Sequence, residues 1–266
     1  MPRVQVDGLN LYYETAGSGP VVLLVGGLGA DGHFWYKQTP ALAERFTVIV
    51  PDNRDTGRSD TPDESYTVRT LAEDLRGFLD ALEVPVAHIV GASGGGFIAQ
   101  EFGLAHPGRV ARMVLCCTSF GGPRSIPIPP ETIQVLLNRT GDPERDLRTF
   151  LPLQLATDYL QTHAAEVDAY VAWRVAHPQP LPAYQRQAAA FLAHDAGARL
   201  PALRLPVLVL HGEMDRVVPA GNGDLLAEII PGARLQRLEG VGHNFLWEAA
   251  DEANRLIIGF LSEDET

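Results

Sequence analysis

Short apolar runs alternate with helical patterns along most of this sequence. Near-continuous Val, Ile and Leu segments are typical of strands in a parallel sheet covered by helices on both faces. The runs that predict such strands are residues 21–25, 46–50, 87–90, 111–117, 207–210 and 233–238. Apolar residues at helical spacing predict a helix within 67–84, and a second helical pattern begins directly after residue 93.

Two segments depart from this rhythm. The N-terminal pieces RVQVDG and LNLYYE predict an antiparallel hairpin that turns at Asp7-Gly8. From Ser119 to Leu205 the chain holds half of its 20 prolines, with amphipathic stretches between them. This composition predicts helices carried on loops. We therefore expect a core domain formed by residues 1–118 and 206–266, and a helical cap formed by residues 119–205.

A cluster of glycines joins the strand at 87–90 to the helix that follows. Gly91-Ala92-Ser93-Gly94-Gly95 matches the pattern G-x-S-x-G, in which the serine lies on a strained strand-to-helix turn and needs tiny neighbours. Such a turn exposes the hydroxyl and directs the next amide and the helix N-terminus at developing negative charge. The alternative, a phosphate-binding turn, requires P-loop or G-x-G-x-x-G spacing, and neither is present. The pattern predicts Ser93 as a nucleophile.

A serine nucleophile requires a general base and an acid that orients the base. Asp215 follows the strand at 207–210, and His243 follows the strand at 233–238. The carboxyl ends of parallel strands meet at one edge of a sheet, and the chain order Ser, Asp, His is typical of this arrangement. Of the other histidines, His211 and His33 are interpreted as structural, with a substrate contact as the alternative for His33.

A second glycine-rich segment, LLVGGLGADGHFW, follows the first strand of the parallel set. A loop in this position lies over the nucleophile and supplies an amide to an oxyanion hole. A simple turn is the alternative. We favour the functional interpretation because the loop and the serine turn end side by side if their strands are close neighbours.

In this order of motifs the sequence resembles the α/β-hydrolase superfamily over nearly its whole length. Within it, the chain is similar to small bacterial esterases and 3-oxoadipate enol-lactonase-like hydrolases. The resemblance implies the α/β-hydrolase fold, with a mostly parallel sheet, helices on both faces and a helical cap inserted before the penultimate strand. It also implies that the amides of Leu28 and Gly94 form the oxyanion hole. Two motifs differ from the family pattern: Asp55 replaces a glycine of D-x-R-G-x-G-x-S, and residues 26–29 (GGLG) replace His-Gly-x-Pro.

These residues predict a serine hydrolase of carboxylic esters or lactones that works through an acyl-enzyme. His243 would take the proton of Ser93, and Asp215 would hold the imidazole in the correct tautomer. One alternative keeps the triad for C–C bond hydrolysis, perhydrolysis or acyl transfer. Another is a non-catalytic ligand receptor on the same scaffold.

The cap residues bear on the substrate. Aromatic side chains are spread along the insertion, and about a third of them are expected to face the ligand: Phe120, Phe150, Tyr159, Tyr170, Trp173, Tyr184 and Phe191. None of its arginines stands in an apolar run where burial would be expected: Arg124, Arg139, Arg145, Arg148, Arg174, Arg186 and Arg199. Because a desolvated carboxylate needs a cationic partner, neutral, short-to-medium acyl esters or lactones are the expected substrates.

The composition and charge of the chain limit the classes of partner that it is expected to bind. The chain has 266 residues and a formal net charge of −12, and its basic residues are scattered, which argues against nucleic acid and anionic membrane as partners. No apolar run has the length of a membrane span, and the N-terminus lacks a secretory apolar region, so a cytoplasmic location is expected.

The adjacent Cys116 and Cys117 predict buried thiols in a reducing compartment. No metal-binding spacing occurs, so no metal or organic cofactor is expected. The oligomeric state stays open.

Overall fold

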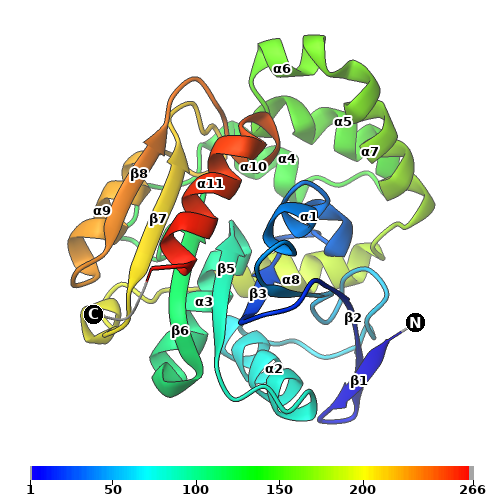
Figure 1. Cartoon of the computed structure of the whole chain (residues 1–266). Helices are drawn as coiled ribbons and strands as arrows, with labels where there is room; N and C mark the ends of the chain where they lie inside the picture. Colours follow the sequence, from blue (N-terminus) through cyan, green and yellow to red (C-terminus); the bar gives the residue numbers. More distant parts are fainter. Residues whose placement is uncertain (1, 264–266) are drawn as a thin grey trace.

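Eight strands form one sheet within residues 2–263, the part of the chain that the computed structural model describes (Figure 1). The strands are β1 (Arg3–Val6), β2 (Leu9–Ala16), β3 (Val21–Val25), β4 (Thr47–Pro51), β5 (Ala87–Ala92), β6 (Val110–Cys116), β7 (Val207–Gly212) and β8 (Arg234–Leu238). Their order is β1-β2-β4-β3-β5-β6-β7-β8. The β3 to β8 strands pair in parallel, whereas β1 with β2 and β2 with β4 pair antiparallel. The predicted strands and the N-terminal hairpin are confirmed.

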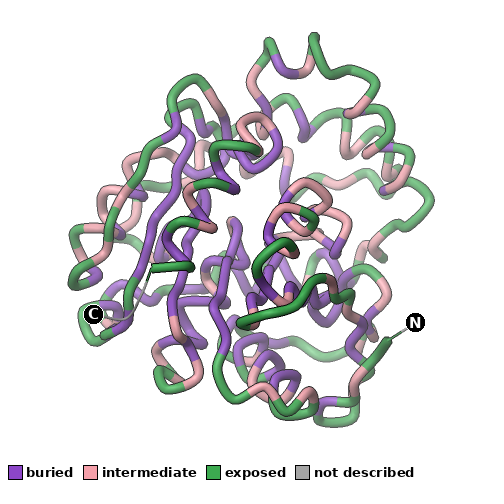
Figure 2. Tube along the Cα trace, viewed as in Figure 1, coloured by how far each residue is buried: buried purple, intermediate pink, exposed green. Residues whose placement is uncertain are grey.

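Helices cover both faces of this sheet. One face carries α2 (Val68–Ala81), α3 (Gly94–Ala105) and α9 (Gly221–Ile229), and the other carries α1 (Gln38–Leu42), α10 (Phe245–Glu248) and α11 (Ala250–Leu261). Alternate residues of each strand enter opposite cores: in β3, Leu23 packs with the α2 and α3 side and Leu24 with the α11 side. Both faces are therefore buried, which explains the near-continuous apolar runs (Figure 2). No helix in the described part of the chain is long and apolar enough to cross a membrane.

The helix expected within residues 67–84 is α2, which runs from Val68 to Ala81. Thr67 caps its N-terminus by accepting a hydrogen bond from the Thr70 amide. The helix ends at Ala81, because Glu83 adopts a left-handed backbone with φ of 55°. A residue in that conformation closes the last turn and cannot continue the helix.

The insertion between β6 and β7 is helical, and it also contains the 3-10 turn η3 (Leu200–Ala202). Two further 3-10 turns, η1 (Gly32–Trp35) and η2 (Pro107–Arg109), lie before it in the chain. Its helices are α4 (Pro130–Leu137), α5 (Pro143–Gln154), α6 (Thr157–Thr162), α7 (Ala164–Ala176) and α8 (Leu181–Leu192). A β-bridge between Gly121 and Asp195 joins the two ends of the insertion. Figure 1 shows α5, α6 and α7 beyond the edge of the sheet toward which β7 and β8 point. This is the edge where side chains after the parallel strands collect.

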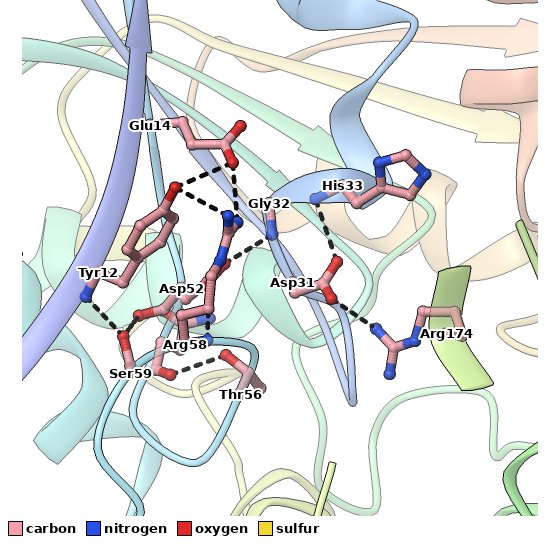
Figure 3. A network of polar contacts seen from close by, with 11 residues as sticks. Tyr12, Glu14, Asp31, Gly32, His33, Asp52, Thr56, Arg58, Ser59 and Arg174 are labelled. Carbon is pink, nitrogen blue, oxygen red and sulfur yellow. Dashed lines mark hydrogen bonds and ion pairs between the residues drawn. The ribbon is translucent and has the colours of Figure 1, made fainter. Parts of the chain in front are cut away.

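The loop after β4 is held by a polar network (Figure 3). The buried Asp52 carboxylate accepts hydrogen bonds from the amides of Gly32, at 2.7 Å, and Arg58, at 2.8 Å. The Arg58 guanidinium lies over the Tyr12 ring and donates to Glu14 at 2.8 Å. These contacts fasten the loop of residues 52–60 to the N-terminal hairpin and to η1. The loop is therefore a rigid support, and it carries the unusual Asp55.

The two cysteines lie at the end of β6. Both are free and buried, which confirms the interpretation of buried thiols. Burial raises the pKa of both thiols, so neither is an activated nucleophile.

Candidate functional site

Ser93 lies on a sharp turn between β5 and α3, with φ of 53° and ψ of −121°. A backbone in this region costs on the order of 1–3 kcal/mol for a residue other than glycine. The turn is held by a hydrogen bond from the Ser93 amide to the Cys116 carbonyl (2.9 Å) and by one from the Thr118 hydroxyl to the Ser93 carbonyl (2.7 Å). A Cβ on Gly91 would lie 2.5 Å from the Gly95 carbonyl oxygen, and a Cβ on Gly95 would overlap the end of β3. The glycines thus remove side chains that the turn cannot hold.

His243 and Asp215 form a hydrogen-bonded pair beyond the ends of β8 and β7. The His243 Nδ1 lies 2.7 Å from Asp215 Oδ2. The other carboxylate oxygen accepts hydrogen bonds from the amides of Val217 and Val218, both at 2.8 Å. Burial alone would raise the pKa of Asp215, but the charge of His243 and the hydrogen bonds from the two histidines lower it to about 2. Asp215 is therefore ionised at neutral pH and fixes the imidazole with Nε2 left to accept a proton.

A cavity of about 770 Å³ between core and cap joins the remaining candidate residues. Leu28, Ser93, Gly94 and His243 all line it, and Asp215 lies behind His243 outside the lining. The structure therefore brings together side chains that are far apart in the sequence. The cavity lies at the carboxyl edge of the sheet, where ligands of open α/β sheets bind.

The glycine-rich loop after β3 lies against the Ser93 turn, as expected. The β3 and β5 strands are direct neighbours, with Val25 opposite Gly91. A Cβ on Gly27 would lie 2.9 Å from the Ala92 carbonyl oxygen and 2.9 Å from the Gly94 nitrogen. The Leu28 amide donates to no described acceptor, and Gly94 is the first residue of α3, where helical amides have no partner within the helix. Both amides are thus free to bind an oxyanion.

Two further histidines have structural contacts. His211 is fully buried, and its Nε2 lies 3.1 Å from Asp215 Oδ2 and 2.9 Å from the Val218 carbonyl oxygen. Both of these atoms are acceptors, so we assign the proton to Nε2 from the hydrogen-bond network. His33 stacks on Trp173 of α7 and does not line the cavity. The structural interpretation of both residues is confirmed.

The cap supplies most of the aromatic lining. Of the aromatic residues expected to include ligand contacts, four line the cavity: Phe150, Tyr170, Tyr184 and Phe191. The other three, Phe120, Tyr159 and Trp173, pack elsewhere. The fraction of the cap's aromatic residues that line the cavity, four of seven, is therefore larger than the third that helical periodicity suggests.

The expectation that no arginine of the insertion faces the cavity is wrong for two of them. Arg174 of α7 is buried and lines the cavity, with its Nη1 3.5 Å from Asp31 Oδ2 (Figure 3). Arg139 also lines it and lies over the Tyr184 ring. The error has a physical reason. Arg174 does stand among apolar residues, in the stretch 170–176 (YVAWRVA), and the carboxylate that pairs with its buried guanidinium, Asp31, comes from the distant loop after β3.

His194 is expected to make the stability of the folded protein depend on pH in the acid range. It lines the cavity with 6% of its surface exposed, and its Nδ1 lies 3.5 Å from the Glu101 carboxylate. Burial lowers the pKa of His194 to about 4, although Glu101 acts in the opposite direction. In the unfolded chain a histidine titrates at about 6.5, so the folded state binds fewer protons between these values and stability is lost as the pH falls.

We expect this residue to account for about 3 kcal/mol of lost stability as the pH falls from about 6.5 to about 4. Urea unfolding at a series of pH values measures this loss. His194→Asn should reduce the slope, whereas the same change at the exposed His163 should not. Equal slopes for the wild type and His194→Asn would contradict the prediction.

The comparisons with known proteins agree with this architecture. A family model described as the alpha/beta hydrolase fold matches residues 20–250. The RutD protein of Azorhizobium caulinodans, named as a carbamate hydrolase, is 32% identical over 266 residues, which cover 99% of each chain. The 2-hydroxy-6-oxo-6-phenylhexa-2,4-dienoate hydrolase of Comamonas testosteroni is 32% identical over 265 residues, which cover 95% of this chain and 91% of the relative.

A solved structure gives the same result. The enol-lactonase from Burkholderia xenovorans LB400 superposes with a TM-score of 0.88 at 28% identity, covering 98% of this chain and 100% of that chain. The expected fold is confirmed, with a mostly parallel sheet, helices on both faces and helices inserted before the penultimate strand. The family match, the whole-length relatives and the shared fold lead to one conclusion: this chain is a hydrolase that belongs to the α/β-hydrolase family.

Proposed function

We propose that this hydrolase cleaves carboxylic esters or lactones through an acyl-enzyme formed on Ser93. The observation that carries the proposal is the 2.7 Å hydrogen bond between His243 Nδ1 and Asp215, which leaves Nε2 of His243 available in the cavity that Ser93 lines. A strained serine, a histidine oriented by an ionised carboxylate and free amides beside the serine are the groups that acyl transfer requires.

The reaction follows from the chemistry of these groups. His243 Nε2 takes the proton of the Ser93 hydroxyl as the oxygen attacks the carbonyl carbon, and the amides of Leu28 and Gly94 bind the oxyanion. The protonated His243 then gives its proton to the leaving alcohol oxygen as the ester C–O bond breaks. Water attacks the acyl-enzyme, His243 takes its proton, and Ser93 regains a proton as the carboxylic acid leaves.

We propose that the substrates are neutral and carry a short-to-medium acyl group. The surroundings of the two arginines that line the cavity support this proposal. Arg174 is paired with Asp31. Arg139 lies near Asp146, whose pKa is lowered by hydrogen bonds from Thr140 and Gly141 and by Arg139, against the effect of burial. Arg174 thus has a carboxylate partner in the protein, and Arg139 donates to the Tyr184 hydroxyl and lies in the field of Asp146. A substrate carboxylate would then have to be desolvated without a cation dedicated to it. The likeness to the enol-lactonase supports lactones as members of the substrate class.

A matched substrate panel tests the proposal. We expect a fluorophosphonate to label Ser93, and neutral p-nitrophenyl esters and lactones to be hydrolysed. Their kcat/KM should exceed that of carboxylate-bearing counterparts of the same length by about tenfold or more, because the charged member must be desolvated. The comparison is run across a salt series, with labelling sites found by mass spectrometry.

The other outcomes discriminate among the alternatives. A preference for the anionic member that fades with added salt would mean that Arg139 or Arg174 is available to the substrate. Faster turnover of a carbamate or of a 2-hydroxy-6-oxo-dienoate would favour another use of the same triad. If the protein shows neither labelling of Ser93 nor turnover of any substrate, the result would favour a non-catalytic receptor.

A further inference from the structure

The loop that carries the Leu28 amide has little in its own sequence to define its shape. Three of the four residues 26–29 are glycine, and the loop lacks the histidine and proline of the related His-Gly-x-Pro pattern. Glycine populates many backbone conformations, whereas proline fixes φ. Gly29 has φ of 70°, and the loop closes through a single backbone hydrogen bond from Ala30 to Gly27, at 3.2 Å. Contacts from outside the loop must therefore select its conformation.

The cap makes such a contact through Gln187 of α8. The Gly29 amide donates a hydrogen bond of 2.8 Å to Gln187 Oε1. The Gln187 side chain is fully buried, and Gln179 Nε2 donates both to Gln187 Oε1, at 3.3 Å, and to the Asp55 carbonyl oxygen, at 2.6 Å. The acceptor on Gln187 is thus held in place by a second glutamine, which is itself bound to the core.

The α8 helix is fixed to the core on both sides of Gln187. Arg186 donates two hydrogen bonds, of 2.8 and 3.0 Å, to the buried carboxylate of Asp55. Asp55 replaces a glycine of the family pattern and has φ of 67°, so a strained residue is kept where its carboxylate binds the cap. Farther along the helix, the Phe191 ring packs directly against Gly94. One helix of the cap thus contacts Gly94 and the amide of Gly29, the residue after Leu28.

We propose that Gln187 is a positioning residue for the oxyanion hole. By accepting the Gly29 hydrogen bond, it holds the glycine-rich loop in the conformation that directs the neighbouring Leu28 amide toward the carbonyl oxygen of the substrate. This inference rests on the proposed function, because it concerns the transition state of acyl transfer at Ser93. Without Gln187 the half-buried Gly29 amide loses its acceptor, and the loop moves to satisfy it elsewhere. An amide displaced in this way stabilises the transition state less while ground-state binding is retained.

The test compares Gln187→Met with Gln185→Met. Gln185 is exposed on the same helix, so the second variant makes the same chemical change without touching the loop. We expect Gln187→Met to lower kcat for a neutral p-nitrophenyl ester by about 10–100-fold, with KM within about threefold, which is the pattern for an interaction made in the transition state. The affinity for an alkyl boronic acid and the rate of fluorophosphonate labelling of Ser93 should fall by the same factor. Gln185→Met should match the wild type in all of these measurements.

A second variant separates positioning from packing. Gln187→Glu keeps an oxygen that can accept from Gly29 and Gln179, and it should recover kcat to within about tenfold of the wild type. Thermal melting checks that each variant is folded. Equal losses in Gln187→Met and Gln187→Glu, a loss confined to KM, or a folded Gln187→Met with kcat within threefold of the wild type would each overturn the positioning role.

Failure of this inference is distinguishable from failure of the proposed function. Ester and lactone turnover by the wild type tests the function, whereas the ratio between Gln187→Met and the wild type tests the positioning role. If the wild type reacts with the fluorophosphonate but turns over no ester, the labelling ratio still decides the role of Gln187. A wild type that gives neither label nor turnover would overturn both.

Discussion

Replacing Ser93 with alanine is expected to lower kcat for a p-nitrophenyl ester by about 10⁴-fold or more. The substitution removes the oxygen that forms the acyl-enzyme and leaves the oxyanion hole and the cavity in place. The fold should be unaffected, because alanine keeps the Cβ atom and meets the same backbone strain at φ of 53°. Any residual rate would come from water attacking a substrate held in the cavity.

Steady-state kinetics and thermal melting measure these effects. The matched control is Ser125→Ala, because Ser125 lines the same cavity but donates its hydroxyl hydrogen bond to the Gly122 carbonyl. The control should change kcat only a few-fold. A Ser93→Ala protein that kept more than about one hundredth of the wild-type kcat would mean that another group is the nucleophile.

Replacing Asp215 with asparagine is expected to lower kcat by about 10³–10⁴-fold. The Asp215 carboxylate accepts hydrogen bonds from two backbone amides and from two histidines. An amide in its place presents an NH₂ group to one of these donors and favours the wrong tautomer of His243. The charge that stabilises the imidazolium is also lost. Both effects act on the general base and leave the substrate contacts in place, so kcat should fall far more than KM rises.

A nearby carboxylate provides the control for Asp215. Glu213 is exposed in the same loop, and Glu213→Gln removes a negative charge at almost the same place in the chain. It should leave kcat within a few-fold of the wild type, which separates a specific hydrogen bond from a general effect of charge. If Asp215→Asn turned over the ester at nearly the wild-type rate, the assignment of the acid would be wrong.

Much of this architecture follows from the sequence by itself, because the forces involved are local or periodic. A strand buried on both faces must be apolar at nearly every position, so β3 to β7 are visible as runs of Val, Ile and Leu. The Ser93 turn is visible because its strained backbone and crowded surroundings allow only tiny neighbours. Asp215 and His243 could be chosen because parallel strands bring the residues after their carboxyl ends to one edge of the sheet.

Only the tertiary structure decided how the cap meets the core. The contacts of Arg174 with Asp31, of Arg186 with Asp55 and of Gln187 with Gly29 join residues that are distant in the chain. Such polar contacts have no period and need no apolar neighbours, since a single partner satisfies the group wherever it lies in the sequence. For the same reason the sequence did not reveal Arg139 and Arg174 as lining residues. Helical periodicity predicts that the cap has apolar faces, but the packing of each helix on the core decides which side chains face the nucleophile.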